Sequence, residues 1–375
     1  MGYNNIRFDD ELTRYTLYRN LLDPFAREWQ NGNSRWDLLN VARMTRALRP
    51  EGLIWPEGTD GRPSLRLELL TAANEISHGQ AHDALCDVQA TLELAVRLRR
   101  AQPRLFQFLW ETRLKARVLA VTSPGTLTPF LWCAPRLSIE RMNLGLVVVV
   151  GRQPGNPNAL ITYDLAYSPH QAMESEWLDE PGEINPFGLL HVNRAPAIAP
   201  LKALRDEDAH RLGICPKTAF QHLEQLKTLP YRKSPAYQKF MQPFPASIDR
   251  DIDWDLYGGF PTESDRQRLR DFRSGDSETF LKMPDHFDNS AYQELCRRFQ
   301  GRNFPETLTE EAAQIWRNHC AACWTDASRG ALTLEAYRAR IAELRDRHAG
   351  EPITLALLDA LDAYGAEKTA MLGPS

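Results

Sequence analysis

The chain has 375 residues, of which 43% are hydrophobic, 25% charged and 9% aromatic. At about 150 residues per domain, this length predicts two to three domains and excludes a single small fold. The composition is that of an ordinary globular protein and excludes disorder or a fibre as a description of the whole chain. Lysine and arginine total 45 against 49 aspartate and glutamate, so an affinity for nucleic acid would need a local basic groove.

The cysteines and the apolar runs indicate where the protein resides. The six cysteines are spread along the chain with no secretory signal before them, which predicts reduced thiols in the cytoplasm. Cys320 and Cys323 follow His319, but a structural zinc site needs a second ligand pair, so a helix with two packed thiols is the preferred interpretation. The longest apolar run, Leu144 to Val150, is far too short to cross a bilayer. We therefore expect a cytoplasmic protein with no membrane partner.

The first hundred residues have the apolar spacing of helices. Helices are predicted over 10–29 with a break at Pro24, over 36–50, over 64–73 and over 81–100. In the last of these, one apolar stripe recurs at helical spacing, formed by Leu85, Val88, Leu92 and Val96. Short runs rich in β-branched residues then predict strands over 117–122, 144–150, 159–165 and 188–192.

Helical spacing returns after Pro200. Helices are predicted over 202–212, 217–229, 265–274, 290–299, 309–323, 332–349 and 353–366. The change of composition near Gln102 and Pro103 marks a first domain boundary, and a long connection that starts at Pro243 marks a second.

One segment, from His78 to Asp87, carries a candidate catalytic pair. On a helix, the spacing of His82 and Asp87 is a rise of about 7.5 Å and a rotation of about 140°, so both side chains can flank one cavity. A histidine of near-neutral pKa can take a proton from water, and a carboxylate can hold a divalent metal. Taken alone, the same spacing favours a solvent-facing capping histidine and a surface aspartate over a catalytic pair.

Further segments resemble a known family. The opening GYNNIRFD places Asp9 after an asparagine and an aromatic residue, just before a helix. With the segment from His78 to Asp87 it resembles the second and third exonuclease motifs of the DnaQ-like superfamily, in the subclass with a catalytic histidine. Matches continue at 33–39, 47–52, 63–68, 102–106, 191–193 and 301–305. The whole chain resembles the bacterial exonuclease I family of single-strand-specific 3′ to 5′ exodeoxyribonucleases.

This resemblance implies a multidomain fold of class α/β + β + α. A truncated ribonuclease-H-like exonuclease domain would occupy residues 1–101, an SH3-like DNA-binding domain 102–250, and a helical C-terminal domain 251–375. The sequence begins after the family's first motif, an Asp-x-Glu on the first strand. We therefore expect weak metal binding and impaired catalysis, because a two-metal site without half of its carboxylates keeps too little charge.

The resemblance also implies a reaction, the metal-assisted release of mononucleotides from single-stranded DNA in repair and recombination. His82 would be the general base, Asp87 a ligand of Mg²⁺, and Asp9 a ligand or outer-shell partner of a second Mg²⁺, with Mn²⁺ as a substitute. Arg66 would bind substrate phosphate. The other positions that match DNA contacts of the family are Arg14, Phe25, Trp29, Arg43, Lys115, Asn158 and Asn193.

A protein partner is implied as well. Arg49, Phe108 and Arg205 match the pocket with which the family binds the acidic, Phe-ended tail of single-stranded-DNA-binding protein. A monomer is expected. Two alternatives stay open: a catalytically inactive module that binds single-stranded DNA or this tail, and an oligoribonuclease, which the two extra domains disfavour.

Simpler interpretations of these side chains also stay open. The arginines Arg14 and Arg43 can be solvated helix faces, and Arg49 a charge at a helix C-terminus. Phe25 and Trp29, four residues apart, can be core residues instead of stacking platforms.

Overall fold

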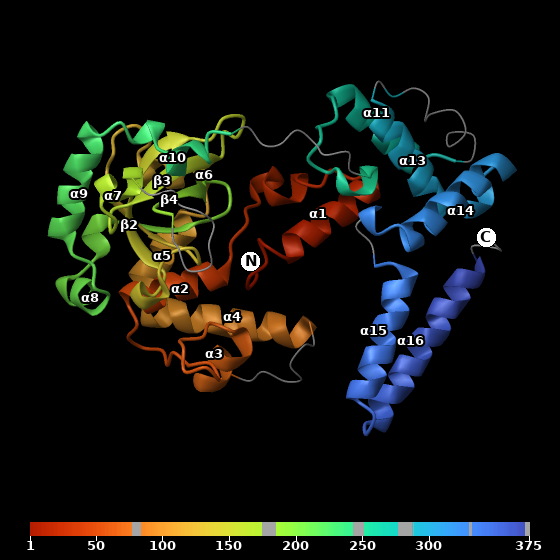
Figure 1. Ribbon diagram of the computed structural model, residues 1–375, viewed down its shortest axis with the longest axis horizontal. Coiled ribbons are helices and arrows are strands. Elements are labelled where there is room, and N and C mark those ends of the chain that lie inside the picture. Colours follow the sequence, from red (N-terminus) through yellow and green to blue (C-terminus); the bar gives the residue numbers. More distant parts are fainter. Residues whose placement is uncertain are drawn as a thin grey trace. The chain divides into compact units, whose positions relative to one another are not determined.

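The computed structural model describes residues 1–76, 84–174, 185–242, 251–276, 287, 289–329 and 332–371. The chain divides into two compact units, each with its own hydrophobic core (Figure 1). The first unit comprises Met1–Leu12 and Phe25–Ala246, and the second comprises Thr13–Pro24 and Ser247–Ser375. The division falls within helix α1 (Asp9–Arg19). This division does not test the domain boundaries predicted at 101/102 and 250/251, which stay predictions.

A five-stranded antiparallel sheet lies at the centre of the first unit (Figure 1). Its register places Leu131 opposite both Leu146 and Ala199. A β-bulge between Val149 and Gly151 interrupts one ladder. In spatial order the strands are β4 (Phe187–His191), β3 (Ala159–Asp164), β2 (Leu144–Arg152), β1 (Phe130–Cys133) and β5 (Ala197–Pro200).

Strand β2 is apolar along almost its whole length because both faces of the sheet are buried. Successive side chains of a strand point to opposite faces. Leu146 and Val148 belong to the larger core, whereas Val147 and Val149 belong to a second cluster on the other face. Helix α6 (Lys115–Thr122) contributes to that second cluster. The strands predicted over 144–150, 159–165 and 188–192 are thus confirmed.

The strand predicted over 117–122 is wrong, because these residues form most of α6. Val118 is fully buried in the second cluster, and Leu119 and Val121 pack against it. Their apolar and β-branched character therefore reflects burial against a sheet and not membership in one. Strands β1 and β5, of four residues each, were not predicted.

The helices predicted over 36–50, 64–73 and 81–100 are confirmed where the structure describes them, whereas the helix predicted over 10–29 ends at Arg19. Asp37 caps one of them by accepting a 3.0 Å hydrogen bond from Leu39 N. They are α2 (Leu38–Leu48), α3 (Leu67–Ala73) and α4 (Ala84–Ala101), and they are followed by α5 (Pro103–Glu111).

The apolar stripe of α4 lies at the surface. Leu85, Val88, Leu92 and Val96 are between 41% and 65% exposed. The buried face of α4 carries instead Ala90, Thr91, Leu94, Ala95 and Leu98. The periodicity thus identifies the helix, but it does not identify the side that packs.

Among the described residues, further helices complete the first unit, one between β3 and β4 and three after β5. They include both helices predicted between residues 202 and 229. They are α7 (Pro169–Glu174), α8 (Asp206–Arg211), α9 (Pro216–Thr228) and α10 (Pro235–Gln238).

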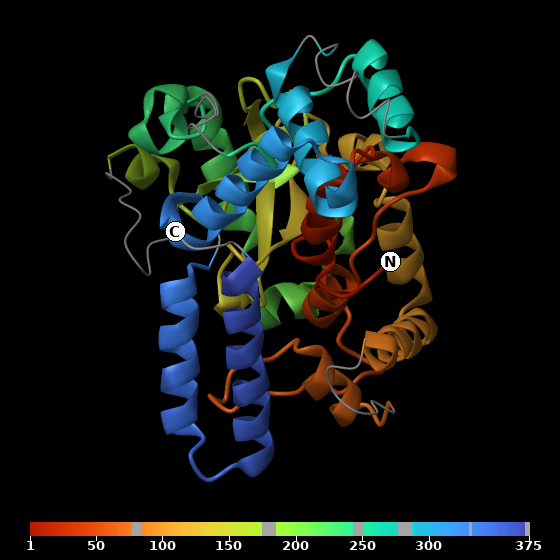
Figure 2. The ribbon, with the colours of Figure 1, turned by 90° about the vertical axis from the view of Figure 1, so that its right-hand side faces the viewer.

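The second unit is helical throughout its described residues. Thr262, Thr309 and Thr333 each cap a helix by accepting a hydrogen bond from a backbone N–H in its first turn. The last two helices form an antiparallel hairpin (Figure 2), in which Tyr337 Oη donates a 2.6 Å hydrogen bond to Leu361 O. The helices, all predicted, are α11 (Glu263–Arg273), α13 (Ser290–Asn303), α14 (Glu310–Thr325), α15 (Leu334–Arg347) and α16 (Pro352–Met371).

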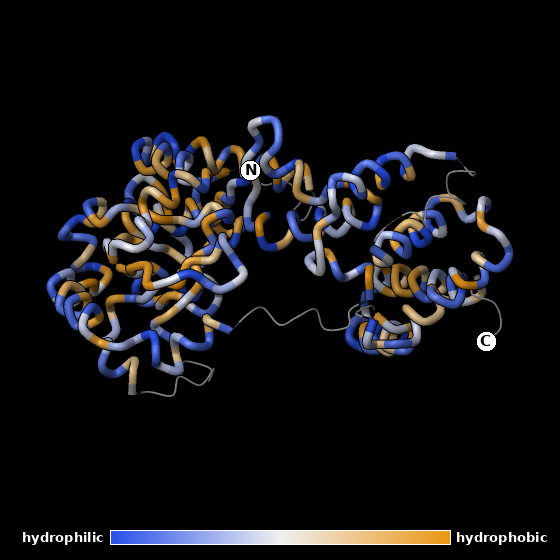
Figure 3. Tube along the Cα trace, turned by 90° about the horizontal axis from the view of Figure 1, so that it is seen from above, coloured by the Kyte–Doolittle hydropathy of each residue, from blue (hydrophilic) through white to orange (hydrophobic). Residues whose placement is uncertain are grey.

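The six cysteines are free thiols. Cys320 and Cys323 are half-buried within α14, which confirms the interpretation as a helix with two thiols. Hydrophobic and hydrophilic residues are interspersed along the chain (Figure 3). Within the described ranges, no helix combines the length and the apolar character that a membrane span requires.

Candidate nucleic-acid interface

Three of the predicted DNA contacts lie together where β3 begins and β4 ends. Lys115 Nζ donates a 2.6 Å hydrogen bond to Asn158 Oδ1. Val192 N donates to Asn158 O over 2.9 Å, which brings the neighbouring residue, the exposed Asn193, to the same edge. One ammonium and one carboxamide thus meet beside the backbone of Asn193, from segments that are far apart in sequence. Such groups are suited to phosphate and sugar contacts.

A cavity next to the start of α2 has a cationic lining. Arg7, Arg43 and Arg194 line it together with one carboxylate, Asp37. His191 also lines it, and burial with the nearby Arg194 lowers the pKa of its imidazole to about 4. The histidine is therefore neutral at pH 7, and the arginines leave an excess of positive charge that favours an anion.

Two arginines one turn apart on α2 are buried, namely Arg43 and Arg46, which are 8% and 4% exposed. Arg43 Nη1 donates a 2.7 Å hydrogen bond to Asn40 Oδ1. For Arg46, neither Nε nor Nη1 has a hydrogen-bond partner among the described residues. Burial lowers the pKa of both guanidinium groups, although arginine stays protonated in proteins.

The remaining predicted contacts of the first unit differ in exposure. Trp29 is 64% exposed, so its ring is available for stacking, whereas Phe25 is half-buried. The exposed Arg66 precedes the first residue of α3 and forms a 2.5 Å ion pair with Glu68.

In the second unit, Arg14 is only 5% exposed, so it is not a solvated surface charge. Its Nη1 donates a 3.0 Å hydrogen bond to Tyr257 Oη. Tyr257 is 52% exposed and was missed by the sequence analysis. The aromatic run from Trp254 to Phe260, with Tyr257 at its centre, was the available signal.

The predicted catalytic residues are only partly described. His82 lies outside the described residues. Asp87 is half-buried in the first turn of α4, and Asp9 is the exposed first residue of α1. No group of three or more His, Cys, Asp and Glu side chains in the described part of the chain is placed to hold a metal ion. These two carboxylates by themselves therefore do not fit a two-metal centre.

Two of the three predicted tail-binding residues meet at one carboxylate. Arg49 Nη1 and Arg205 Nε lie 3.1 and 2.6 Å from Asp208 Oδ2. Burial would raise the pKa of Asp208, but the bonds from Arg205 and Arg211 outweigh it and lower the pKa. The third residue, Phe108, is a half-buried residue of α5 that packs against the larger core.

Comparisons with known proteins agree with the family resemblance. The model of the exonuclease I SH3-like domain matches residues 113–244, and that of the exonuclease I C-terminal domain matches residues 250–368. Exodeoxyribonuclease I of Escherichia coli K12 is 36% identical over 98% of this chain and 79% of its own length.

Solved structures of the same family superimpose closely on the chain. Exonuclease I from Methylocaldum szegediense gives a TM-score of 0.89 at 39% identity, over 98% of this chain and 79% of that one. The E. coli enzyme in complex with a dA16 oligonucleotide gives 0.85 at 34% identity, over 98% and 80%. A structure described as SSB/exonuclease I with an inhibitor gives 0.82 at 34% identity, over 98% and 79%. The chain belongs to the exonuclease I family, and its multidomain fold is the one that the resemblance implies.

Proposed function

We propose that this chain binds single-stranded DNA and hydrolyses it from the 3′ end, releasing mononucleotides, with impaired activity because Asp9 and Asp87 by themselves do not fit a two-metal centre. The observation that carries the proposal is the hydrogen bond between Lys115 and Asn158, with Asn193 next to them at one edge of the sheet. A family member has been solved with the single-stranded oligonucleotide dA16, which supports the same class of ligand here.

Binding of a single strand needs positive charge along the backbone and aromatic faces for the bases. In this proposal Lys115, Arg43 and Arg66 contact phosphates. The exposed ring of Trp29 stacks on a base, and the half-buried Phe25 is a second aromatic side chain proposed to contact the strand. Arg14 and Tyr257 form a further contact in the second unit, where the phenol is the exposed member of the pair.

For the chemical step we propose that His82 accepts a proton from the attacking water. Asp87 and Asp9 are the proposed acidic residues of the site. Membership of the exonuclease I family implies dependence on a divalent metal, and Mg²⁺ is the ion that we propose. We also propose a cytoplasmic monomer that acts in DNA repair.

The test is release of mononucleotides from a 3′-labelled single-stranded DNA, with Mg²⁺ and with EDTA. We expect weak release with Mg²⁺, none with EDTA, and its loss in His82→Ala and Asp87→Ala. His348→Ala is a matched control, because this histidine pairs with Glu351 far along the sequence from the site. Binding without release would instead favour the inactive binding module, and faster release from RNA would favour an oligoribonuclease. A version extended upstream by an Asp-x-Glu strand tests whether that motif restores activity.

A second proposed activity is binding of the acidic, Phe-ended tail of single-stranded-DNA-binding protein. It is favoured by the meeting of Arg49 and Arg205 at Asp208, because guanidinium N–H groups can donate hydrogen bonds to a peptide carboxylate. We expect Arg49→Ala and Arg205→Ala to weaken the affinity for a fluorescent tail peptide about tenfold each. Equal affinity in both variants would contradict this site.

A further inference from the structure

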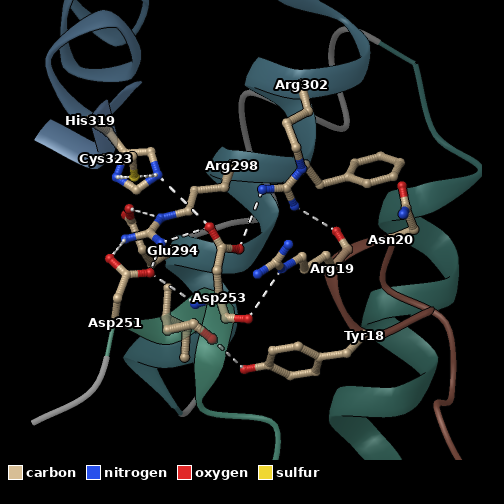
Figure 4. Close-up of polar contacts among 12 residues, drawn as sticks. Tyr18, Arg19, Asn20, Asp251, Asp253, Glu294, Arg298, Arg302, His319 and Cys323 are labelled. Carbon is tan, nitrogen blue, oxygen red and sulfur yellow. Dashed lines mark hydrogen bonds and ion pairs between the residues drawn. The ribbon is translucent and has the colours of Figure 1, made fainter. Parts of the chain in front are cut away.

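The short segment Ile252–Trp254 holds the last turn of α1 in the second unit (Figure 4). Tyr18 Oη donates a 3.0 Å hydrogen bond to Ile252 O, and Arg19 Nε donates a 3.2 Å hydrogen bond to Asp253 O. The guanidinium of Arg19 also lies over the ring of Trp254, 4.4 Å from its centroid. Two consecutive side chains of α1 are therefore attached to the backbone of one segment.

Arg302, from α13, joins the same helix end to the same segment (Figure 4). Its Nη2 donates a 2.7 Å hydrogen bond to Arg19 O, at the C-terminus of α1, and its Nη1 lies 3.3 Å from Asp253 Oδ1. The last carbonyls of a helix have no partner within the helix, and a cation there is favourable. Arg302 thus satisfies the end of α1 and fixes it against Asp253.

Asp253 is itself held in place. Arg298 Nη1 lies 3.0 Å and His319 Nε2 lies 3.8 Å from Asp253 Oδ2. Burial alone would raise the pKa of this carboxyl, but the neighbouring His319 and the charges of Arg302 and Arg298 outweigh it and hold the pKa far below its ordinary value. The carboxylate stays ionised at pH 7, so its ion pair with Arg302 persists.

The attachment of α1 determines where Arg14 and Tyr257 meet. Arg14 lies about one turn before Tyr18 on α1, and Tyr257 follows Trp254 closely in sequence. Their 3.0 Å hydrogen bond therefore depends on how α1 is seated against the segment 252–257. Tyr15 packs on Trp254 between these two points, with ring centroids 5.9 Å apart.

We propose that Arg302 is a positioning residue for single-stranded DNA binding, which acts by seating α1 so that Arg14 and Tyr257 meet. Arg302 itself contacts α1 and Asp253 and not the DNA. The inference rests on the proposed function, in which Arg14 and Tyr257 contact the strand.

A double-mutant cycle tests it with the full chain and a fluorescent oligo-dT. We expect Arg302→Ala and Arg14→Ala each to weaken binding about fivefold, and the double variant to be no weaker than Arg14→Ala alone. Arg302→Lys, which keeps a donor for Arg19 O, should restore part of the affinity. Hydrogen exchange at residues 13–19 should accelerate in Arg302→Ala, because the helix end is released.

Arg329→Ala is the matched control. Arg329 pairs with Asp251 of the same cluster, at 3.2 Å, and should leave the affinity unchanged. If Arg302→Ala fails to fold, Tyr18→Phe can replace it, because it removes the hydrogen bond from Tyr18 to Ile252 O that also holds α1. Combined with Arg14→Ala, it should again bind no more weakly than Arg14→Ala alone.

Four results would overturn the inference. Additive losses in the cycle would show that Arg302 does not act through Arg14. Equal losses in Arg302→Ala and Arg329→Ala would show a general destabilisation of the cluster. Unchanged affinity in Arg14→Ala, with binding by the unmodified chain, would remove the positioning role and leave the proposed function standing, whereas no binding by the unmodified chain would contradict both.

Discussion

Lys115 Nζ donates a 2.6 Å hydrogen bond to Asn158 Oδ1, which joins the start of α6 to the residue before β3. The bond is exposed, so the ammonium remains accessible to a phosphate. A lysine that neutralises one phosphate of a single strand contributes about 0.7 to the slope of log affinity against log salt.

We therefore expect Lys115→Ala to weaken oligo-dT binding and to lower this slope by about 0.7. Asn158→Ala should weaken binding with the slope unchanged, because it removes no charge. Lys227→Ala is the control, since Lys227 is an exposed lysine of the same unit paired with Glu224 at 2.7 Å. Equal slopes in the Lys115 and Lys227 variants would refute the phosphate contact.

Trp29 offers a contact of a different physical kind. Its ring is 64% exposed, and stacking of one base on an aromatic side chain is worth about 1–3 kcal/mol. Trp29→Ala should lower the affinity for oligo-dT by an amount that hardly changes with salt, as measured by fluorescence titration at two salt concentrations. Tyr364→Ala, which removes another exposed aromatic ring, should have no effect. A loss that disappears at high salt would argue against stacking.

Local pattern predicted most elements of this fold, and its failures have physical causes. The segment 117–122 looks like a strand because Val118 and Val121 are β-branched, yet its side chains are selected by packing against the sheet. In α4 the larger residues, such as Leu85 and Leu92, are the exposed ones. Neighbouring elements decide which face of a helix packs, and the periodicity of its sequence carries no information about those neighbours.

Residues of the candidate nucleic-acid interface could be predicted only where they lie in a segment that matches the family. Lys115, Asn158 and Asn193 come from family matches, and the structure adds that they share one edge. The proposed role of Tyr257 depends on a contact with Arg14 across 243 positions of sequence. No local signal predicts a pairing of that range. The same holds for Arg302 and the end of α1, which are separated by 283 positions.

The lowered pKa of Asp253 makes the stability of the second unit depend on pH. A carboxyl whose pKa is lower in the folded state stabilises the fold above its unfolded pKa of about 3.9, and this contribution is lost as the pH falls further. Asp253→Asn should cost about 3 kcal/mol at pH 7, because it leaves buried guanidinium groups without a charge partner. As the pH falls from about 5 to about 3, the free energy of unfolding of Asp253→Asn should then decrease less than that of the unmodified chain.

Urea unfolding at several pH values measures both effects. Asp326→Asn is the control, because Asp326 is an exposed aspartate of the same unit that pairs with Arg329 at 3.7 Å. A parallel pH dependence in Asp253→Asn and the unmodified chain would show that other carboxyls determine the acid lability.

Replacing Arg46 should stabilise the fold, whereas replacing Asp253 should destabilise it. It is 4% exposed, and its Nε and Nη1 have no hydrogen-bond partner among the described residues. Leaving a buried donor unsatisfied costs about 1–3 kcal/mol, and methionine can occupy a similar volume without donors. Arg46→Met should therefore raise the free energy of unfolding by about 1 kcal/mol. Arg298→Met, which removes a buried arginine paired with Asp251 and Asp253, should lower it by about 3 kcal/mol, since it breaks a buried ion pair. If Arg46→Met were as destabilising as Arg298→Met in the same urea titration, Arg46 would have to have an anionic partner in solution.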